Sequence, residues 1–279
     1  MVLGVWARIA MSRPPVEPRF QGHRGGAIAM HRALTHFRLG PRNLLMSVSL
    51  FLFFSAIWVA LLPSLCRFWT GFLRLGVRLL PLHGTLEVAE HGFSWFRLGI
   101  PYIRIYPVLP SLWMWSLTCL LTLSLFVGTF FLPHKYLPLS YLLRAILAVH
   151  STSLVYFALW PLRFPHAPDS YMESLITSGI GLITVVPLLY ALTYYIFDFG
   201  FWKKAVLTVL TVAHLSLFLP FQALLQALAL QTTILFMPVL YIVFGLPILV
   251  LMIMGFYSWA MSWSFRSSRQ GQDAPTVHP

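Results

Sequence analysis

Three ionisable side chains fall inside stretches that are apolar enough to cross a bilayer, namely Arg144, His150 and His214. His150 is near the middle of the run Leu137–Leu162, and His214 lies about two-thirds of the way along Phe201–Leu219. Two imidazoles on facing helices can ligate a b-type haem or bind a quinone head group, so a redox site is one hypothesis. The alternative is that each imidazole hydrogen-bonds a neighbouring hydroxyl or carbonyl group. Arg144 lies in the first turns of its run, from which its side chain can reach the membrane surface.

A second group of ionisable residues follows that run in the polar segment RFPHAPDSYMES. His166, Asp169 and Glu173 are of types that hold metals or exchange protons, and they can meet at the mouth of a helical bundle. The competing interpretation, which we favour, is ordinary helix-start chemistry, with Asp169 or Ser170 as the N-cap and Glu173 in the first turn. No HExxH, GxSxG, P-loop or CxxC motif is present, so we predict no metal site and do not favour an enzyme. Residues of an earlier polar loop that can join the group are Glu87, Glu90 and His91.

The composition is that of an integral membrane protein. Of the 279 residues, 58% are hydrophobic and 9% are charged, whereas about a quarter of the residues of a soluble domain are charged. The 19 Lys and Arg residues outnumber the 7 Asp and Glu residues. Because the positive charge lies in tails and loops beside apolar runs, it indicates membrane orientation and anionic lipid rather than nucleic acid. Cys66 and Cys119 are too few for a disulfide framework or a zinc site.

The apolar runs predict an all-α integral membrane fold, a polytopic helical bundle of about six transmembrane helices within residues 44–263. The last run is too long for one simple crossing, so splitting it near Gly245 gives seven spans as the alternative. The segment between the last two runs places Gln222 and Gln226 one turn apart, which suits an interfacial or cavity-facing turn. The predicted spans are about 44–65, 112–132, 137–162, 172–197, 201–219 and 232–263.

The loop 66–111 between the first two spans is predicted to lie on the outer side of the membrane, where it can dock a protein partner. It begins as an amphipathic interfacial helix, in which Arg67, Arg74 and Arg78 form one stripe that can contact lipid head groups. After this helix, apolar and polar residues alternate in short runs within Thr85–Val108, and Gly and Pro residues separate the runs. That pattern predicts a small extended segment outside the bilayer, because unpaired strand edges are not tolerated in lipid.

The two ends of the chain are predicted to be cytoplasmic. Residues 1–43 hold seven Arg and one acidic residue, and with residues 264–279 they form polar tails, the first of them disordered. Met30 and Met46 are alternative start positions. With both ends inside, the inner segments carry twelve Lys and Arg residues and the outer segments carry six, as the positive-inside rule requires. The charge distribution favours this orientation; the bacterial inner (plasma) membrane is the location that the resemblance described next implies, and the Arg-rich start leaves an organellar membrane as the alternative.

Two stretches carry a resemblance to a known family. They are SYLLRAILAVHSTSLVYFAL (140–159) and LLYALTYYIFDFGFWKKAVLTVL (188–210), which together make up about a sixth of the chain. They resemble a family of bacterial inner-membrane proteins of unknown function that usually begin with a small zinc ribbon. The ribbon is absent here, because no cysteine precedes Cys66. The resemblance implies a multi-pass topology in the inner membrane and no particular activity.

The sequence therefore favours a non-enzymatic membrane component, one that helps to assemble or export envelope material. Two alternatives remain open at this point. One is a haem- or quinone-binding protein that uses His150 and His214. The other is a membrane-embedded transferase or hydrolase that acts on a lipid-linked substrate at the outer face through His166, Asp169 and Glu173.

Overall fold

The computed structural model describes residues 20–21, 27–28, 41–93, 96–160, 164, 167–194 and 201–272. The chain divides into two units, Met1–Leu44 and Leu45–Pro279. In the first unit, two short antiparallel strands pair, β1 (Phe20–Gln21) with β2 (Ala27–Ile28). The rest of the N-terminal tail, for which disorder was predicted, lies outside the described residues as far as residue 40.

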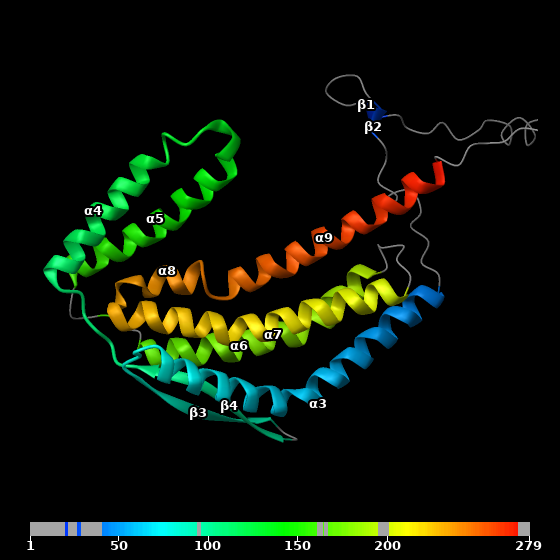
Figure 1. Cartoon of the computed structure of the whole chain (residues 1–279), viewed down its shortest axis with the longest axis horizontal. Coiled ribbons are helices and arrows are strands. Elements are labelled where there is room, and N and C mark those ends of the chain that lie inside the picture. The colour runs from blue at the N-terminus through cyan, green and yellow to red at the C-terminus, as the bar shows by residue number, and fades with distance from the viewer. Residues whose placement is uncertain are drawn as a thin grey trace, which may run out of the picture. The chain divides into compact units, whose positions relative to one another are not determined.

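The second unit is the predicted helical bundle, with one hairpin of strands against it (Figure 1). In the described part of the chain, five helical segments are long and apolar enough to cross a membrane. Helix α4 coincides with the predicted second span but has 17 residues, which is at the lower limit for crossing. The helices are α3 (Pro41–Leu79), α4 (Leu112–Gly128), α5 (Leu137–Leu159), α6 (Pro168–Tyr194), α7 (Phe201–Thr232), α8 (Met237–Ile242) and α9 (Leu246–Gln272), with short 3-10 helices η1 (His134–Tyr136) and η2 (Ile234–Phe236).

Helix α3 corrects the predicted boundary between the first span and a separate amphipathic helix. It runs without a break through residue 65 and has 39 residues, about 58 Å at 1.5 Å per residue. On the predicted apolar side, Trp69 and Leu73 are buried in the protein core and Phe72 packs against it, whereas Leu79 is 73% exposed. The protein therefore covers the first turns of that side, where the helix continues past residue 65.

Helices α6, α7 and α9 lie side by side at the centre of the unit, and α3 packs on α6 and α7 (Figure 1). Tryptophans of α3 tie it to both neighbours, since Trp58 Nε1 donates to Thr184 Oγ1 and Trp69 Nε1 donates to Ser216 O, each at 2.8 Å. Contacts between α6 and α7 run in opposite chain order, as in antiparallel neighbours: Tyr171 with Gln226, Gly179 with Leu219 and Tyr190 with Thr211.

Helix α7 also corrects a predicted boundary. The fifth span was expected to end at residue 219, but the helix passes through Pro220 and continues to Thr232. Proline has no backbone N–H, so the carbonyl of Ser216, four residues earlier, loses its usual helical donor. Because the Trp69 indole hydrogen-bonds that carbonyl, the helix continues at a lower cost.

The last apolar run bends at the predicted place but does not form two spans. It is built of η2, α8 and α9, with the chain turning at residues 243–245. Gly245 is required there, because a Cβ atom would lie 2.5 Å from the carbonyl oxygen of Tyr241. Helix α8 has only six residues and cannot cross a bilayer, so this run is one interrupted span. Helix α9 extends past residue 263 to Gln272, into the predicted C-terminal tail.

Helices α4 and α5 form an antiparallel pair joined through η1. Trp115 Nε1 of α4 donates to the carbonyl oxygen of Leu154 in α5 at 3.0 Å. Helix α5 in turn contacts η2 and α8, where Ser153 Oγ donates to Leu235 O at 2.7 Å. The end of α5, the start of α6 and helix α8 therefore come together in one region of the bundle.

Candidate functional site on the hairpin and helix α6

The predicted extended segment is a regular hairpin attached to the helices. Strands β3 (Gly84–Phe93) and β4 (Phe96–Ile105) pair antiparallel over ten residues each. Strand β4 packs against α6 and α7, and four of its aliphatic side chains are at most 3% exposed. The buried side chains before Pro101 are Leu98 and Ile100, and those after it are Ile103 and Ile105. The strand therefore turns a different face towards the core on either side of Pro101.

Strand β3 is the more exposed strand of the hairpin. Val88 and Glu90 are exposed, with 51% of the Val88 surface accessible. In the described sheet β3 pairs with β4 alone, so its other edge carries backbone N–H and C=O groups without a strand partner. The hairpin thus presents an open edge while β4 fixes it to the bundle.

One ionic cluster lies across the hairpin. The hydroxyl group of Tyr102, directly opposite Glu87, donates to Glu87 Oε2 at 2.8 Å, and Arg104 Nη1 donates to Oε1 at 2.9 Å. These donors, Arg104 foremost, hold the pKa of the Glu87 carboxyl below its ordinary value. The same carboxylate raises the pKa of the Tyr102 hydroxyl, because a phenolate beside it is disfavoured.

A second contact joins the hairpin to the start of α6. His91 Nε2 of β3 lies 3.6 Å from Glu173 Oε1, beyond ordinary hydrogen-bond length, with both side chains about one-third exposed. His91 Nδ1 is buried and has no hydrogen-bond partner among the described residues. An imidazole beside a carboxylate can accept or donate a proton, so the pair is chemically competent for acid–base work.

The structure brings together only part of the predicted group. Glu173 meets His91, and the negative charge of Glu173 acts on Tyr102 while that of Asp169 acts on Arg104. His166 lies outside the described residues. No cluster of three or more His, Cys, Asp or Glu side chains able to hold a metal occurs in the described part of the chain.

The two histidines proposed for a redox site are not brought together. His150 is buried and stacks on Phe236 of η2, with ring centroids 5.5 Å apart. His214 is exposed; its ring stacks on Phe218 at 6.1 Å and meets Phe256 of α9 edge-on at 5.1 Å. The helical stretch from Leu246 to Phe256 alone spans about 15 Å, so the imidazoles lie at different levels of the bundle. This arrangement does not supply the facing pair that a bis-histidine haem needs.

Arg144 bonds the C-terminal end of the neighbouring helix α4. Its Nε donates to Thr129 Oγ1 at 2.9 Å and its Nη2 donates to Thr129 O at 3.3 Å, at the C-cap of α4. The guanidinium group also lies 4.2 Å from the centre of the Phe130 ring. A cation at the carbonyl end of a helix is favourable, so Arg144 is explained by structure.

The predicted arginine stripe keeps its exposed position. Arg67, Arg74 and Arg78 are exposed along the C-terminal part of α3, and Arg67 Nη2 donates to Ser64 Oγ at 3.2 Å. Because α3 is longer than the roughly 30 Å hydrocarbon core, this part of the helix extends beyond it unless the helix is steeply tilted.

Sequence reasoning placed Gln222 and Gln226 one turn apart but did not identify the polar network that they form. The hydroxyl of Tyr171 in α6 donates to Gln226 Oε1, and Gln226 Nε2 donates to the Phe244 carbonyl at the break between α8 and α9. Gln222 Nε2 donates to the same carbonyl and, at 3.1 Å, to Gly245 O. The one-turn spacing of the glutamines was the available signal. Their side chains donate to the carbonyl groups at the break between α8 and α9.

Comparisons with known proteins give no relative from which a role could be transferred: no family model, no curated protein and no solved structure matches this chain.

Proposed function

We propose that this multi-pass membrane protein is a non-enzymatic component of the bacterial inner membrane that helps to assemble or export envelope material. The hairpin is its docking surface for a protein partner. The observation that carries the proposal is the one-sided burial of the hairpin, with β4 packed on α6 and α7 and β3 exposed. A surface held in one conformation loses less entropy on binding, which favours a docking role.

The chemistry of β3 indicates how a partner would bind. The open edge of β3 can accept an extended segment as a further strand, with main-chain hydrogen bonds supplying affinity. Glu90 and Arg97, both exposed, provide charges of opposite sign at the far end of the hairpin, which can fix the register of that segment.

The membrane setting completes the proposal. Both chain ends lie in the cytoplasm, as the distribution of Lys and Arg favours, and the resemblance to inner-membrane proteins supports the same location. The exposed stripe of Arg67, Arg74 and Arg78 contacts anionic lipid head groups at the outer surface, where α3 leaves the hydrocarbon core.

The experiment must leave the hairpin folded, because deleting it would uncover apolar residues of α6 and α7. The double variant Val88→Lys/Glu90→Lys changes only exposed side chains of β3. We expect the wild-type protein to migrate in a larger complex on native gels, and the variant, expressed from the native locus, to lose that complex and to raise envelope permeability to detergents. Lys135→Glu, in the connection between α4 and α5, is the matched control. Unchanged complexes and permeability in the β3 variant, at normal protein levels, would contradict the proposal.

The contact between His91 and Glu173 favours a second candidate, a transferase or hydrolase that acts on a lipid-linked substrate at the outer face. Glu173 would orient the imidazole, His91 would exchange the proton, and Asp169 and His166 would complete the group. Protein reconstituted in vesicles with a radiolabelled polyprenyl-linked saccharide tests this candidate. Release of the saccharide that is lost in both His91→Asn and Glu173→Gln would support it, whereas release that persists in both would remove it.

A further inference from the structure

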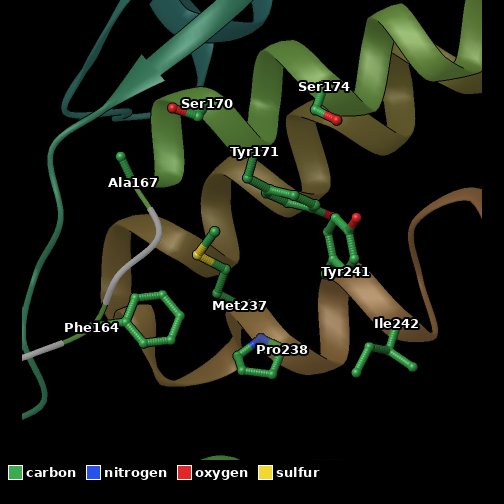
Figure 2. A pocket seen from close by; sticks show the side chains of 9 residues that line it. All are labelled: Phe164, Ala167, Ser170, Tyr171, Ser174, Met237, Pro238, Tyr241 and Ile242. Atoms are coloured by element: carbon green, nitrogen blue, oxygen red, sulfur yellow. The ribbon is translucent and has the colours of Figure 1, made fainter.

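A cavity of about 590 Å³ lies between the start of α6 and helix α8, beside the chain segment that follows α5. Figure 2 shows Tyr171 from α6 and Tyr241 from α8 converging on one side of it, with Phe164 on the other. The volume is within the range of small-molecule sites in proteins. The described residues that line it are Phe164, Ala167, Ser170, Tyr171, Ser174, Met237, Pro238, Tyr241 and Ile242.

The walls of the cavity are held in place by contacts outside it. Tyr171 is 4% exposed and is fixed by its hydrogen bond to Gln226, while its ring lies 5.7 Å from that of Tyr241. Phe164 stacks on Phe157 of α5 with centroids 5.3 Å apart. The cavity is therefore a formed feature of the bundle and does not depend on one mobile side chain.

Hydroxyl groups give the cavity its polar character. Ser170, Ser174 and Tyr241 line it, and their hydroxyls have no hydrogen-bond partner among the described residues. Other serines in helices of this chain, such as Ser151 and Ser216, bond the carbonyl four residues earlier. All three residues are exposed, Tyr241 by 60%, so their hydroxyls are open to a ligand that enters the cavity and can bond it.

The cavity lacks the charge that a phosphate would need. None of the described residues that line it is charged. The nearest acids on the same turns of α6, Asp169 and Glu173, add negative charge beside it, which disfavours an anion. The cavity lies where α5 ends and α6 begins, and its apolar side is formed by Met237, Pro238 and Ile242 of α8.

We propose that this cavity binds a neutral amphiphile, with one apolar chain against Phe164, Met237 and Ile242 and a head of hydroxyl or ester groups on Ser170, Ser174 and Tyr241. A diacylglycerol, which would enter by one of its two acyl chains, and a prenol share this chemistry and are the two sources to distinguish. The site is separate from the hairpin edge, and its binding does not depend on the proposed docking role.

The test uses the purified full-length protein and native mass spectrometry with three probes: dioleoylglycerol, farnesol and dioleoyl phosphatidic acid. We expect at least one neutral probe to bind tenfold more tightly than the phosphatidic acid, and the tighter of the two identifies the source. Tyr241→Phe removes one hydroxyl and should weaken that binding about three- to tenfold, as expected for one hydrogen bond. Ser174→Leu fills the cavity and should abolish it.

Tyr141→Phe is the matched control, since Tyr141 is 62% exposed and Tyr241 is 60% exposed, and it should leave binding unchanged. Tyr241→Phe alters no packed group and keeps the test decisive if Ser174→Leu fails to fold. Equal binding of phosphatidic acid, or binding of the neutral probes that is the same in wild type and Tyr241→Phe, would overturn the proposal.

Discussion

The indole nitrogen of Trp69 in α3 donates a hydrogen bond to the carbonyl oxygen of Ser216 in α7 at 2.8 Å. In a regular helix that carbonyl would accept from the backbone N–H of residue 220, which here is proline. A side chain 147 positions earlier in the sequence therefore supplies the donor that the local sequence lacks. The predicted ends of the first and fifth spans, at residues 65 and 219, therefore lie inside the continuous helices α3 and α7.

This relationship predicts a coupling between two substitutions. Trp69→Phe should lower the free energy of unfolding by about 1–3 kcal/mol, because a buried carbonyl loses its partner. In a Pro220→Ala background the alanine N–H can bond that carbonyl, so Trp69→Phe should cost less. Thermal unfolding of the four proteins in detergent measures the cycle. Trp113→Phe, at a site 76% exposed, is the control, and purely additive effects would contradict the explanation.

The break between α8 and α9 should depend on the glutamines of α7. Gln226→Leu removes the acceptor of the buried Tyr171 hydroxyl and one of the two amide donors to the Phe244 carbonyl, which keeps Gln222. We expect a loss of about 1–3 kcal/mol, because the Tyr171 hydroxyl is left unsatisfied. Leu225→Ala, at a half-exposed neighbour, is the control and should change the melting temperature much less. A Gln226→Leu protein as stable as wild type would show that water or lipid satisfies this hydroxyl.

Two glycines of α6 should respond in opposite directions to the same substitution. A Cβ atom at Gly179 would lie 2.6 Å from a methyl carbon of Leu219, whereas nothing lies within 4 Å of one at Gly181. Gly179→Ala should therefore destabilise the contact with α7 by about 1–3 kcal/mol. Gly181→Ala should stabilise the helix by up to about 1 kcal/mol. Thermal unfolding of both variants checks the signs, and destabilisation by both would refute the assigned packing.

The hairpin should lose stability in acid. The folded state lowers the pKa of Glu87 from its ordinary value of 4.5, so the ionised carboxylate stabilises the fold. That contribution is complete above the ordinary pKa and disappears as the pH falls through the lowered value. Hydrogen exchange of β3–β4 peptides should thus accelerate below about pH 4.5 in wild type more than in Glu87→Gln. Glu90→Gln, the same change on an exposed residue of β3, should behave like wild type.

Several features of the fold were predictable because they depend on neighbours in the sequence. Hydropathy over some twenty residues identifies the membrane class and the centres of the apolar helices. Alternation broken by Gly and Pro in Thr85–Val108 identifies the hairpin, and Gly245 marks the bend of the last run. The contact between Glu173 and the hairpin was expected as one possibility, since both segments follow span ends on the same side of the predicted bundle.

Other features were decided only by the tertiary structure. Proline at 220 is a local helix-breaking signal, yet α7 continues because Trp69 bonds the freed carbonyl. The pattern at residues 66–80 is that of a surface helix, yet the first turns of its apolar side meet protein. His150 and His214 have similar depth in their runs, but packing places one on η2 and the other on α9. In each case the residue that decides the structure comes from a distant part of the chain. A local sequence pattern cannot predict which distant residue will pack against it.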